Sequence, residues 1–93
     1  MRVIIRQSAE NDIDHIFVRI SEDNRVAATN MVSRIREHIN RVKLDALANM
    51  GRPGIIEGTK ELLEHPYIIV YRISEKRDEI VILSVVHGAQ DRS

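Results

Sequence analysis

Cysteine and tryptophan are absent from this chain, and its 93 residues include only one phenylalanine and two tyrosines. Without cysteine there can be no disulfide and no thiol chemistry, which suits a cytoplasmic protein. The longest uninterrupted apolar run is about five residues, far short of the roughly 20 that a membrane-spanning helix needs. The opening residues are too charged and their apolar run too short for a signal peptide, so we expect a cytoplasmic location.

The chain also lacks an excess of charge of either sign, since 14 Lys and Arg balance 14 Asp and Glu. A protein that holds nucleic acid by its phosphates usually carries a basic excess or a basic face. Composition therefore counts mildly against nucleic acid as the main partner, although a local basic face stays open. His15, His38 and His65 have no metal-ligand spacing, and no phosphate-binding glycine loop or nucleophile motif occurs. We expect no metal and no cofactor.

The length predicts a single domain over residues 1–93, with room for one sheet and two helices but not for a deep cofactor site. A short β-branched run at residues 3–5 predicts an opening strand. Ser8 is the expected N-cap of the first helix, with Glu10 and Asp12 in its first turn. One apolar stripe recurs there at helical spacing, formed by Ile13, Ile16, Phe17 and Ile20.

A second helix is predicted after a break at Asp23 and Asn24, which can cap it. We expect it to end between Val42 and Met50, with Gly51 as its stop signal. The short break between the helices predicts an antiparallel helical hairpin. Its apolar stripe comprises Ala28, Met31, Val32, Ile35, Ile39 and Val42.

Three strands complete the predicted fold, at residues 58–63, 67–74 and 80–87. Turns are expected at residues 51–54, at His65–Pro66 and at residues 75–78. The predicted class is α+β with the order β-α-α-β-β-β, an antiparallel sheet with a two-helix hairpin packed on one face. Because the last two strands are apolar on both faces, the uncovered face is expected to be a partner site.

Register decides which side chains can work together on this sheet. A hairpin centred on residues 76–77 pairs Arg72 with Val81 and Pro66 with His87. A turn at residues 64–65 sets Leu62 opposite Tyr67. Strand alternation then predicts Arg72 and His87 on one face but at opposite ends, roughly 20 Å apart, too far for an acid–base pair.

Each polar candidate has a structural reading beside a functional one. Arg72 is a candidate phosphate or partner contact, or an ion-pair partner of Glu57 or Glu61. His87 is a candidate acid or base, or simply a histidine at a strand end. Arg52 is a candidate contact residue or a turn residue with a solvated side chain. A further run of basic residues is expected to be a solvated helix face, namely Arg34, Arg36, Arg41 and Lys43.

Taken together, several short motifs resemble the ParE/RelE toxin superfamily of type II toxin–antitoxin systems. They are Gly-Arg-Pro-Gly at 51–54, Gly-Thr-Lys-Glu-Leu at 58–62, Tyr-x-Ile-x-Tyr-Arg at 67–72, His-Gly-Ala-x-Asp at 87–91 and an Ala-Glu-x-Asp-Ile opening at 9–13. The resemblance covers nearly the whole chain and implies the fold class reached above from periodicity. The 87–91 ending looks like the ParE and plasmid-stabilisation branch. Where ParE-like chains often carry a proline before the Gly-Arg turn, residues 47–50 read Leu-Ala-Asn-Met.

The resemblance implies a growth-inhibiting toxin and leaves its target open between two branches. ParE-like members inhibit DNA gyrase by binding and are not nucleases, so Arg52, Lys60, Arg72, His87 and Arg92 would be target-binding residues with no catalytic role. RelE-like members cut mRNA on the ribosome, in which case Arg72 would stabilise phosphate charge and His87 would act as acid or base. No aromatic residue follows Tyr71, so a C-terminal catalytic tyrosine is missing. A third reading is an inert, decayed toxin.

Every active reading implies a cognate, ParD-like antitoxin in a toxin–antitoxin hetero-oligomer. Its amphipathic helix is expected on the apolar face and groove of the toxin, with a strand on the sheet edge as a further expectation.

Overall fold

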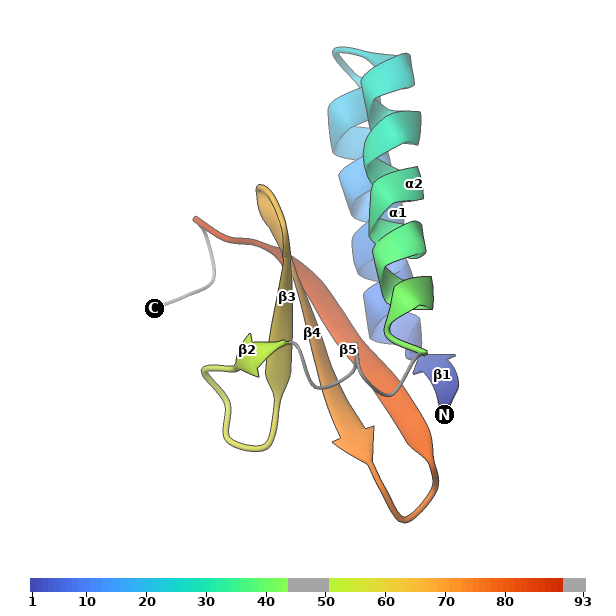
Figure 1. Cartoon of the computed structure of the whole chain (residues 1–93). Helices are drawn as coiled ribbons and strands as arrows, with labels where there is room; N and C mark the ends of the chain where they lie inside the picture. The colour runs from blue at the N-terminus through green and yellow to red at the C-terminus, as the bar shows by residue number, and fades with distance from the viewer. Residues whose placement is uncertain (44–50, 90–93) are drawn as a thin grey trace.

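A computed structural model gives the fold and describes residues 1–43 and 51–89. Its helices are α1 (Gln7–Ser21) and α2 (Arg25–Arg41). Its strands are β1 (Arg2–Ile5), β2 (Arg52–Pro53), β3 (Lys60–Glu64), β4 (Tyr67–Ser74) and β5 (Glu79–His87). The two helices lie side by side as a hairpin on one face of a twisted sheet (Figure 1).

The strands form one sheet in the order β1-β5-β4-β3-β2. The predicted α+β class and helical hairpin are confirmed, with two differences in detail. β1 pairs with β5 in parallel, so the sheet is mixed, and the two-residue strand β2 joins its other edge. Neither feature is local in the sequence, because β1 meets a strand more than 70 positions away and β2 is too short to show alternation.

Helix α1 begins one residue earlier than its predicted cap. Arg6 occupies the N-cap position without a side-chain hydrogen bond, and Ser8 lies inside the helix. The Ser8 hydroxyl instead donates to the Leu83 carbonyl of β5 at 2.8 Å. The prediction of Ser8 as N-cap was therefore wrong, because this hydroxyl finds its partner on the sheet and not at the helix terminus.

Helix α2 begins as predicted, since the Asn24 side chain accepts a hydrogen bond from the Ala27 backbone N–H at 3.0 Å. It ends at Arg41, with buried Val42 as its C-cap. The helix therefore ends one residue before the predicted range of 42–50, and Gly51 is not its stop signal. The predicted extension through residues 44–50 lies outside the described residues.

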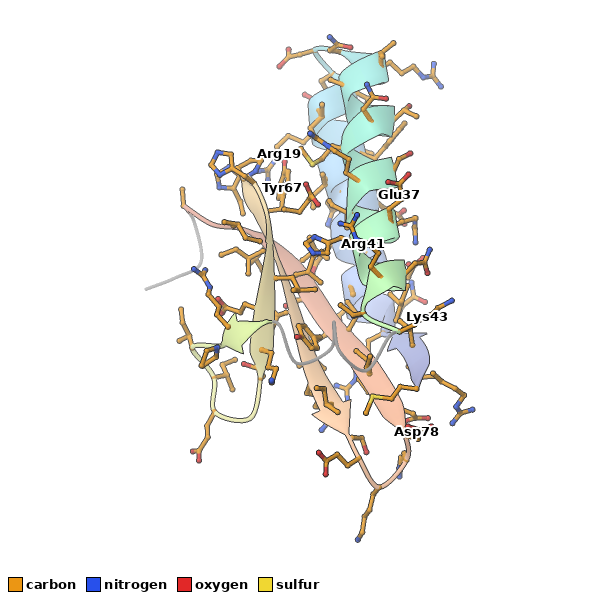
Figure 2. The ribbon with its side chains drawn as sticks, in the orientation of Figure 1. Arg19, Glu37, Arg41, Lys43, Tyr67 and Asp78 are labelled. Atoms are coloured by element: carbon orange, nitrogen blue, oxygen red, sulfur yellow. The ribbon has the colours of Figure 1, made fainter. Side chains whose placement is uncertain are left out.

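The hydrophobic core lies between the hairpin and the sheet. From the helices it takes Ala9, Ile13, Ile16, Met31, Ile35, Ile39 and Val42; from the sheet it takes Tyr67, Ile69, Tyr71, Ile80, Ile82 and Val85. An ion pair between Arg36 and Glu10, 3.0 Å from Nη1 to Oε1, joins the two helices. His38 Nδ1 lies 3.1 Å from Glu64 Oε1 and joins α2 to β3. Arg34, Arg41 and Lys43 are exposed as predicted (Figure 2).

The β3–β4 register differs from the prediction by two residues. Leu62 pairs with Ile69, and Glu64 pairs with Tyr67 across the turn at His65–Pro66. The prediction that placed Leu62 opposite Tyr67 had set the turn one residue too early. Glu57 consequently lies before β3, outside the strands, and does not face Arg72.

A β-bulge divides the β4–β5 hairpin into two segments. On the turn side, Arg72 pairs with Val81 and Tyr71 with Ile82, as predicted. Beyond the bulge, Val70 pairs with Ser84 and Tyr67 pairs with His87, so Leu83 is the extra residue. The predicted Pro66–His87 pairing is therefore wrong by one residue. Because side chains alternate along a strand, one extra residue exchanges the faces of everything that follows.

Candidate functional site

Arg72 and His87 lie on opposite faces of the sheet. Arg72 pairs with Val81 on the face away from the helices, which we call the open face. His87 pairs with core residue Tyr67 and therefore belongs to the helix-covered face. The prediction that they share a face was wrong because of the bulge. The conclusion that Arg72 and His87 cannot form an acid–base pair still holds, because the sheet lies between the two side chains and they cannot act on one phosphate.

His87 is engaged by its own neighbourhood. Its ring meets the Tyr67 ring edge to face, with centroids 5.5 Å apart. Its Nδ1 accepts a hydrogen bond from the Ala89 backbone N–H at 3.1 Å. The two rings line a shallow hollow of about 160 Å³ at the end of the sheet, together with Asp12, His15, Ile16, Arg19, Val85 and Val86. Figure 2 labels Arg19 and Tyr67 at this end of the molecule.

Two other predicted contact residues belong to the β2–β3 edge. Arg52 donates from Nε to Oε1 of Glu61 at 3.2 Å, and Glu61 is the buried acidic residue of the sheet, 4% exposed. The other Glu61 oxygen accepts from the Ile55 backbone N–H at 3.3 Å. The predicted alternative in which Arg72 pairs with Glu61 is thus replaced by Arg52. Lys60 is half-buried opposite Pro53, and Arg92 lies outside the described residues.

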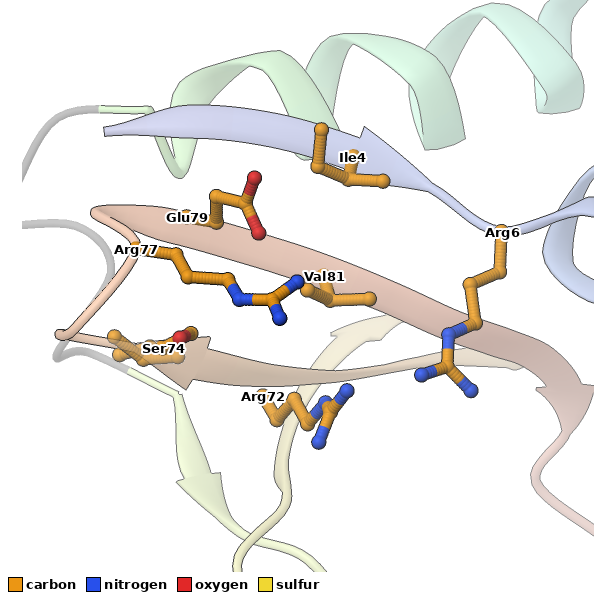
Figure 3. A pocket seen from close by; sticks show the side chains of 8 residues that line it. Ile4, Arg6, Arg72, Ser74, Arg77, Glu79 and Val81 are labelled. Atoms are coloured by element: carbon orange, nitrogen blue, oxygen red, sulfur yellow. The ribbon is translucent and has the colours of Figure 1, made fainter.

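Three arginines line a hollow on the open face, and we call it the arginine cleft. Arg6 reaches it from the junction of β1 and α1, Arg72 from β4 and Arg77 from the β4–β5 turn (Figure 3). The cleft measures about 470 Å³, and its other lining residues are Ile4, Ile73, Ser74, Glu79 and Val81. Sequence reasoning found Arg72 but missed Arg6 and Arg77. The signal for Arg6 was alternation, because Arg2, Ile4 and Arg6 occupy every second position along β1 and the residue after it. In a strand of four residues such a pattern is too short to stand out.

The carboxylate in the lining of the cleft already has a cationic partner, whereas the described residues give the three arginines no anionic one. Glu79 bonds Arg2 across the β1–β5 pair, so its charge is compensated. Within residues 1–43 and 51–89, no ion pair or side-chain hydrogen bond engages the guanidinium groups of Arg6, Arg72 or Arg77. The three side chains are exposed. The arrangement can therefore hold an anion.

A second hollow lies on the helical hairpin and is mainly apolar. It measures about 620 Å³ and is lined by Ile20, Ala27, Asn30, Met31, Ser33, Arg34 and Glu37. We call this hollow the helical groove. Val26, next to Ala27 in the sequence, is 70% exposed. A mainly apolar hollow on a pair of helices is typical of a surface that receives a further helix.

The Tyr71 hydroxyl has a clearly displaced pKa. Burial in the core raises the pKa of its hydroxyl above the ordinary value, and a hydrogen bond with the Gly51 backbone partly opposes that rise. The bond ties the start of the β2 segment to the centre of β4. Tyr71 is thus a structural anchor between the sheet and residue 51.

A comparison with known families decides the identity of the chain. The family model described as the ParE toxin of the type II toxin–antitoxin system parDE matches residues 3–92. The chain belongs to the ParE toxin family. The resemblance predicted from the sequence motifs is therefore confirmed over nearly the whole chain.

Two solved structures resemble this ParE family member closely in fold. One is from the chromosomal ParDE toxin–antitoxin system of P. aeruginosa, with 26% identity, a TM-score of 0.81, and coverage of 94% of this chain and 95% of that one. The other is from the toxin–antitoxin complex RelBE2 of Mycobacterium tuberculosis, with 23% identity, a TM-score of 0.66, and coverage of 92% and 95%. At that lower identity the second likeness shows the fold alone. No curated protein matches the chain.

The described part of this ParE family member offers neither a metal site nor a membrane-spanning helix. Over residues 1–43 and 51–89, no group of three His, Cys, Asp or Glu side chains is placed to bind a metal ion. In the same residues, neither helix is long and apolar enough to cross a membrane.

Proposed function

We propose that this ParE family toxin inhibits DNA gyrase by binding to it, without bond chemistry of its own. The supporting observation is the separation of Arg72 and His87 by the sheet. A ribonuclease mechanism needs a base, an acid and a cation around one phosphate. Here the cation lies on the open face, while the histidine is packed on Tyr67 and bonded to its own turn.

The likeness to a ParDE structure supports the ParE branch, and with it gyrase as the proposed target. Among the proposed contact residues, Arg72 is the best placed, because its guanidinium group is exposed beside Arg6 and Arg77. Arg52, Lys60 and Arg92 stay predictions; the side chain of Arg52 is 52% exposed and can contact a partner while it holds Glu61. His87 fits a structural role at the strand end.

A supercoiling assay with purified gyrase tests the target. Addition of the toxin in increasing ratio is expected to block supercoiling, and Arg72→Gln is expected to weaken the block. Arg41→Gln is the matched control, since Arg41 is an exposed arginine on the helical side. Unaffected supercoiling at a large excess of folded toxin would refute the proposal.

The rival reading, a ribosome-dependent mRNA endonuclease, makes a different prediction in cells. Primer extension on cellular mRNA after induction would show new 5′ ends in a wild-type culture and fewer in a strain with both Arg72→Ala and His87→Ala. We expect no such ends. Normal growth after induction in a host without an antitoxin would instead favour an inert protein.

We also propose a ParD-like antitoxin as the neutralising partner, with an amphipathic helix in the helical groove. The lining of the groove combines apolar Ile20, Ala27 and Met31 with polar side chains, a pattern that suits such a helix. Replacing Ala27 by glutamate should place a charge in this groove and abolish rescue of growth by the antitoxin. The matched control is Thr29→Glu, an exposed position on the same helix outside the groove lining.

A further inference from the structure

The arginine cleft concentrates positive charge that the described residues leave unmatched. Three guanidinium groups face one hollow, and the only carboxylate in its lining belongs to Glu79. That carboxylate bonds Arg2, which lies outside the lining. Like charges held together repel one another, and an anion placed between them removes that repulsion. The cleft is therefore suited to receive negative charge from outside.

The floor of the cleft is aliphatic. Val81 is only 7% exposed, while Ile4 is 38% exposed and stands beside it in the paired strands β1 and β5. Ile73 lines the same hollow. Figure 3 shows Ile4 and Val81 on neighbouring strands, with Arg6, Arg72 and Arg77 extending into the cleft from different elements. A ligand for this site must therefore match both the guanidinium groups of the arginines and the apolar floor.

An acidic peptide fits that combination better than a nucleic acid does. Single-stranded nucleic acid is usually held by aromatic side chains that stack on its bases. Tyr67 and Tyr71 both belong to the core between the sheet and the helices, so neither presents a ring in the cleft lining. Aliphatic side chains of a peptide, by contrast, gain by covering the exposed part of Ile4. The neutral net charge of the chain points the same way.

We propose that the arginine cleft binds an extended acidic segment of a protein partner, with carboxylate and aliphatic side chains in alternation. This inference rests on the proposed function only in taking the toxin to act by docking on proteins. Carboxylates on one side of an extended peptide recur every two residues, roughly 7 Å apart. Each can accept two parallel hydrogen bonds from one guanidinium group. The intervening aliphatic side chains lie on the floor.

Fluorescence anisotropy with a labelled synthetic peptide tests the proposal directly. The probe has about ten residues that alternate Glu and Val, and the matched probe has Gln in place of every Glu. We expect the full-length toxin to bind the Glu probe at low salt and to bind the Gln probe at least about tenfold more weakly. Affinity for the Glu probe should fall as salt rises, because the contacts are charged and exposed.

Variants of the toxin locate the binding. Arg72→Gln and Arg77→Gln are each expected to weaken Glu-probe binding about tenfold, and the pair of changes more than either alone. Arg41→Gln should leave binding unchanged. Far-UV circular dichroism checks that each variant is folded, which we expect because the three side chains are exposed. If Arg41→Gln weakens Glu-probe binding as much, the probe binds through non-specific attraction to positive charge, and the proposed site is overturned.

A nucleic-acid arm separates the competing ligand. Labelled single-stranded RNA and DNA oligonucleotides are titrated against the same proteins, and we expect no dependence on Arg72 or Arg77. Arginine-dependent binding of the oligonucleotides without binding of the Glu probe would overturn the proposal. The supercoiling assay is independent of both. If the peptide binds and gyrase is unaffected, the proposed peptide site stands and gyrase as the target is refuted. If gyrase is inhibited and the peptide does not bind, gyrase stands as the target and the peptide site is refuted.

Discussion

Replacing Asp12 by alanine should lower the free energy of unfolding by about 2 kcal/mol, because Asp12 completes the edge of β5. Strand β1 covers that edge only as far as Ile5, after which the Arg6 backbone N–H bonds the Ile82 carbonyl. Helix α1 then takes over. The Ser8 hydroxyl donates to the Leu83 carbonyl, and Asp12 Oδ2 accepts from the Val85 N–H at 2.9 Å.

The magnitude follows from what alanine leaves behind. Val85 is 3% exposed, so its N–H loses a carboxylate partner in a place that water reaches poorly. A hydrogen bond to a charged acceptor contributes about 1.5–3 kcal/mol, and an unsatisfied buried donor costs about 1–3 kcal/mol. In a domain of this size, 2 kcal/mol corresponds to a fall in Tm of roughly 8–16 °C. Asp12→Asn keeps an acceptor without the charge and should lose about half as much.

Urea denaturation followed by far-UV circular dichroism measures the effect, with the slope checked for two-state behaviour. Asp14→Ala is the matched control, because Asp14 is an exposed residue of the same helix. Both changes gain similar helix propensity, so the difference between them isolates the bond to Val85. A difference below about 0.5 kcal/mol would refute the reasoning, since it would mean that the edge needs no side-chain acceptor.

The remaining predictions concern the β2 side of the sheet. Since burial raises the pKa of Tyr71, its contribution to stability is fully present below pH about 10 and is lost as the pH rises through the folded-state pKa. Tyr71→Phe should abolish the late tyrosinate phase in an alkaline absorbance titration. If that phase persists in the variant, it belongs to another tyrosine. Gly51→Ala should cost about 1–3 kcal/mol in urea unfolding, because the new Cβ overlaps the Tyr71 hydroxyl; an unchanged midpoint would contradict that clash. Arg52→Ala should cost about 1–2 kcal/mol, because it deprives buried Glu61 of a donor, whereas Arg41→Ala should be nearly neutral in the same assay.

Features fixed by nearby residues were predictable from the sequence. The stripes of both helices, the Asn24 cap and the charged turn at residues 75–78 follow from spacing and side-chain chemistry within a few positions. Asp78 even supplies the left-handed conformation that this turn uses, with φ of 53°. Such elements form because local preference and burial agree.

Features decided by distant partners were not predictable in the same way. Ser8 reads as a helix cap, but the carbonyl of Leu83 lies 75 positions away and takes its hydroxyl. The bulge at Leu83 lies in an aliphatic run that only Ser84 interrupts, and no glycine marks it. A single unannounced residue was enough to put His87 on the wrong predicted face. Of the three arginines in the cleft, only Arg72 was predicted from the sequence. The others were missed because the cleft is lined by residues of β1, β4, β5 and the adjoining segments, which become neighbours only in the sheet.

The two surfaces of this toxin set a condition on how it is neutralised. The helical groove lies on the helical hairpin and the arginine cleft lies on the face of the sheet away from the hairpin, and the two share no lining residue. If the toxin acts through the cleft, an antitoxin helix confined to the groove would leave Arg72 accessible to the target. Neutralisation then requires the antitoxin chain to continue around an edge of the sheet and occupy the cleft as well. An antitoxin segment with the acidic and aliphatic character proposed for the cleft ligand would meet that requirement by direct competition.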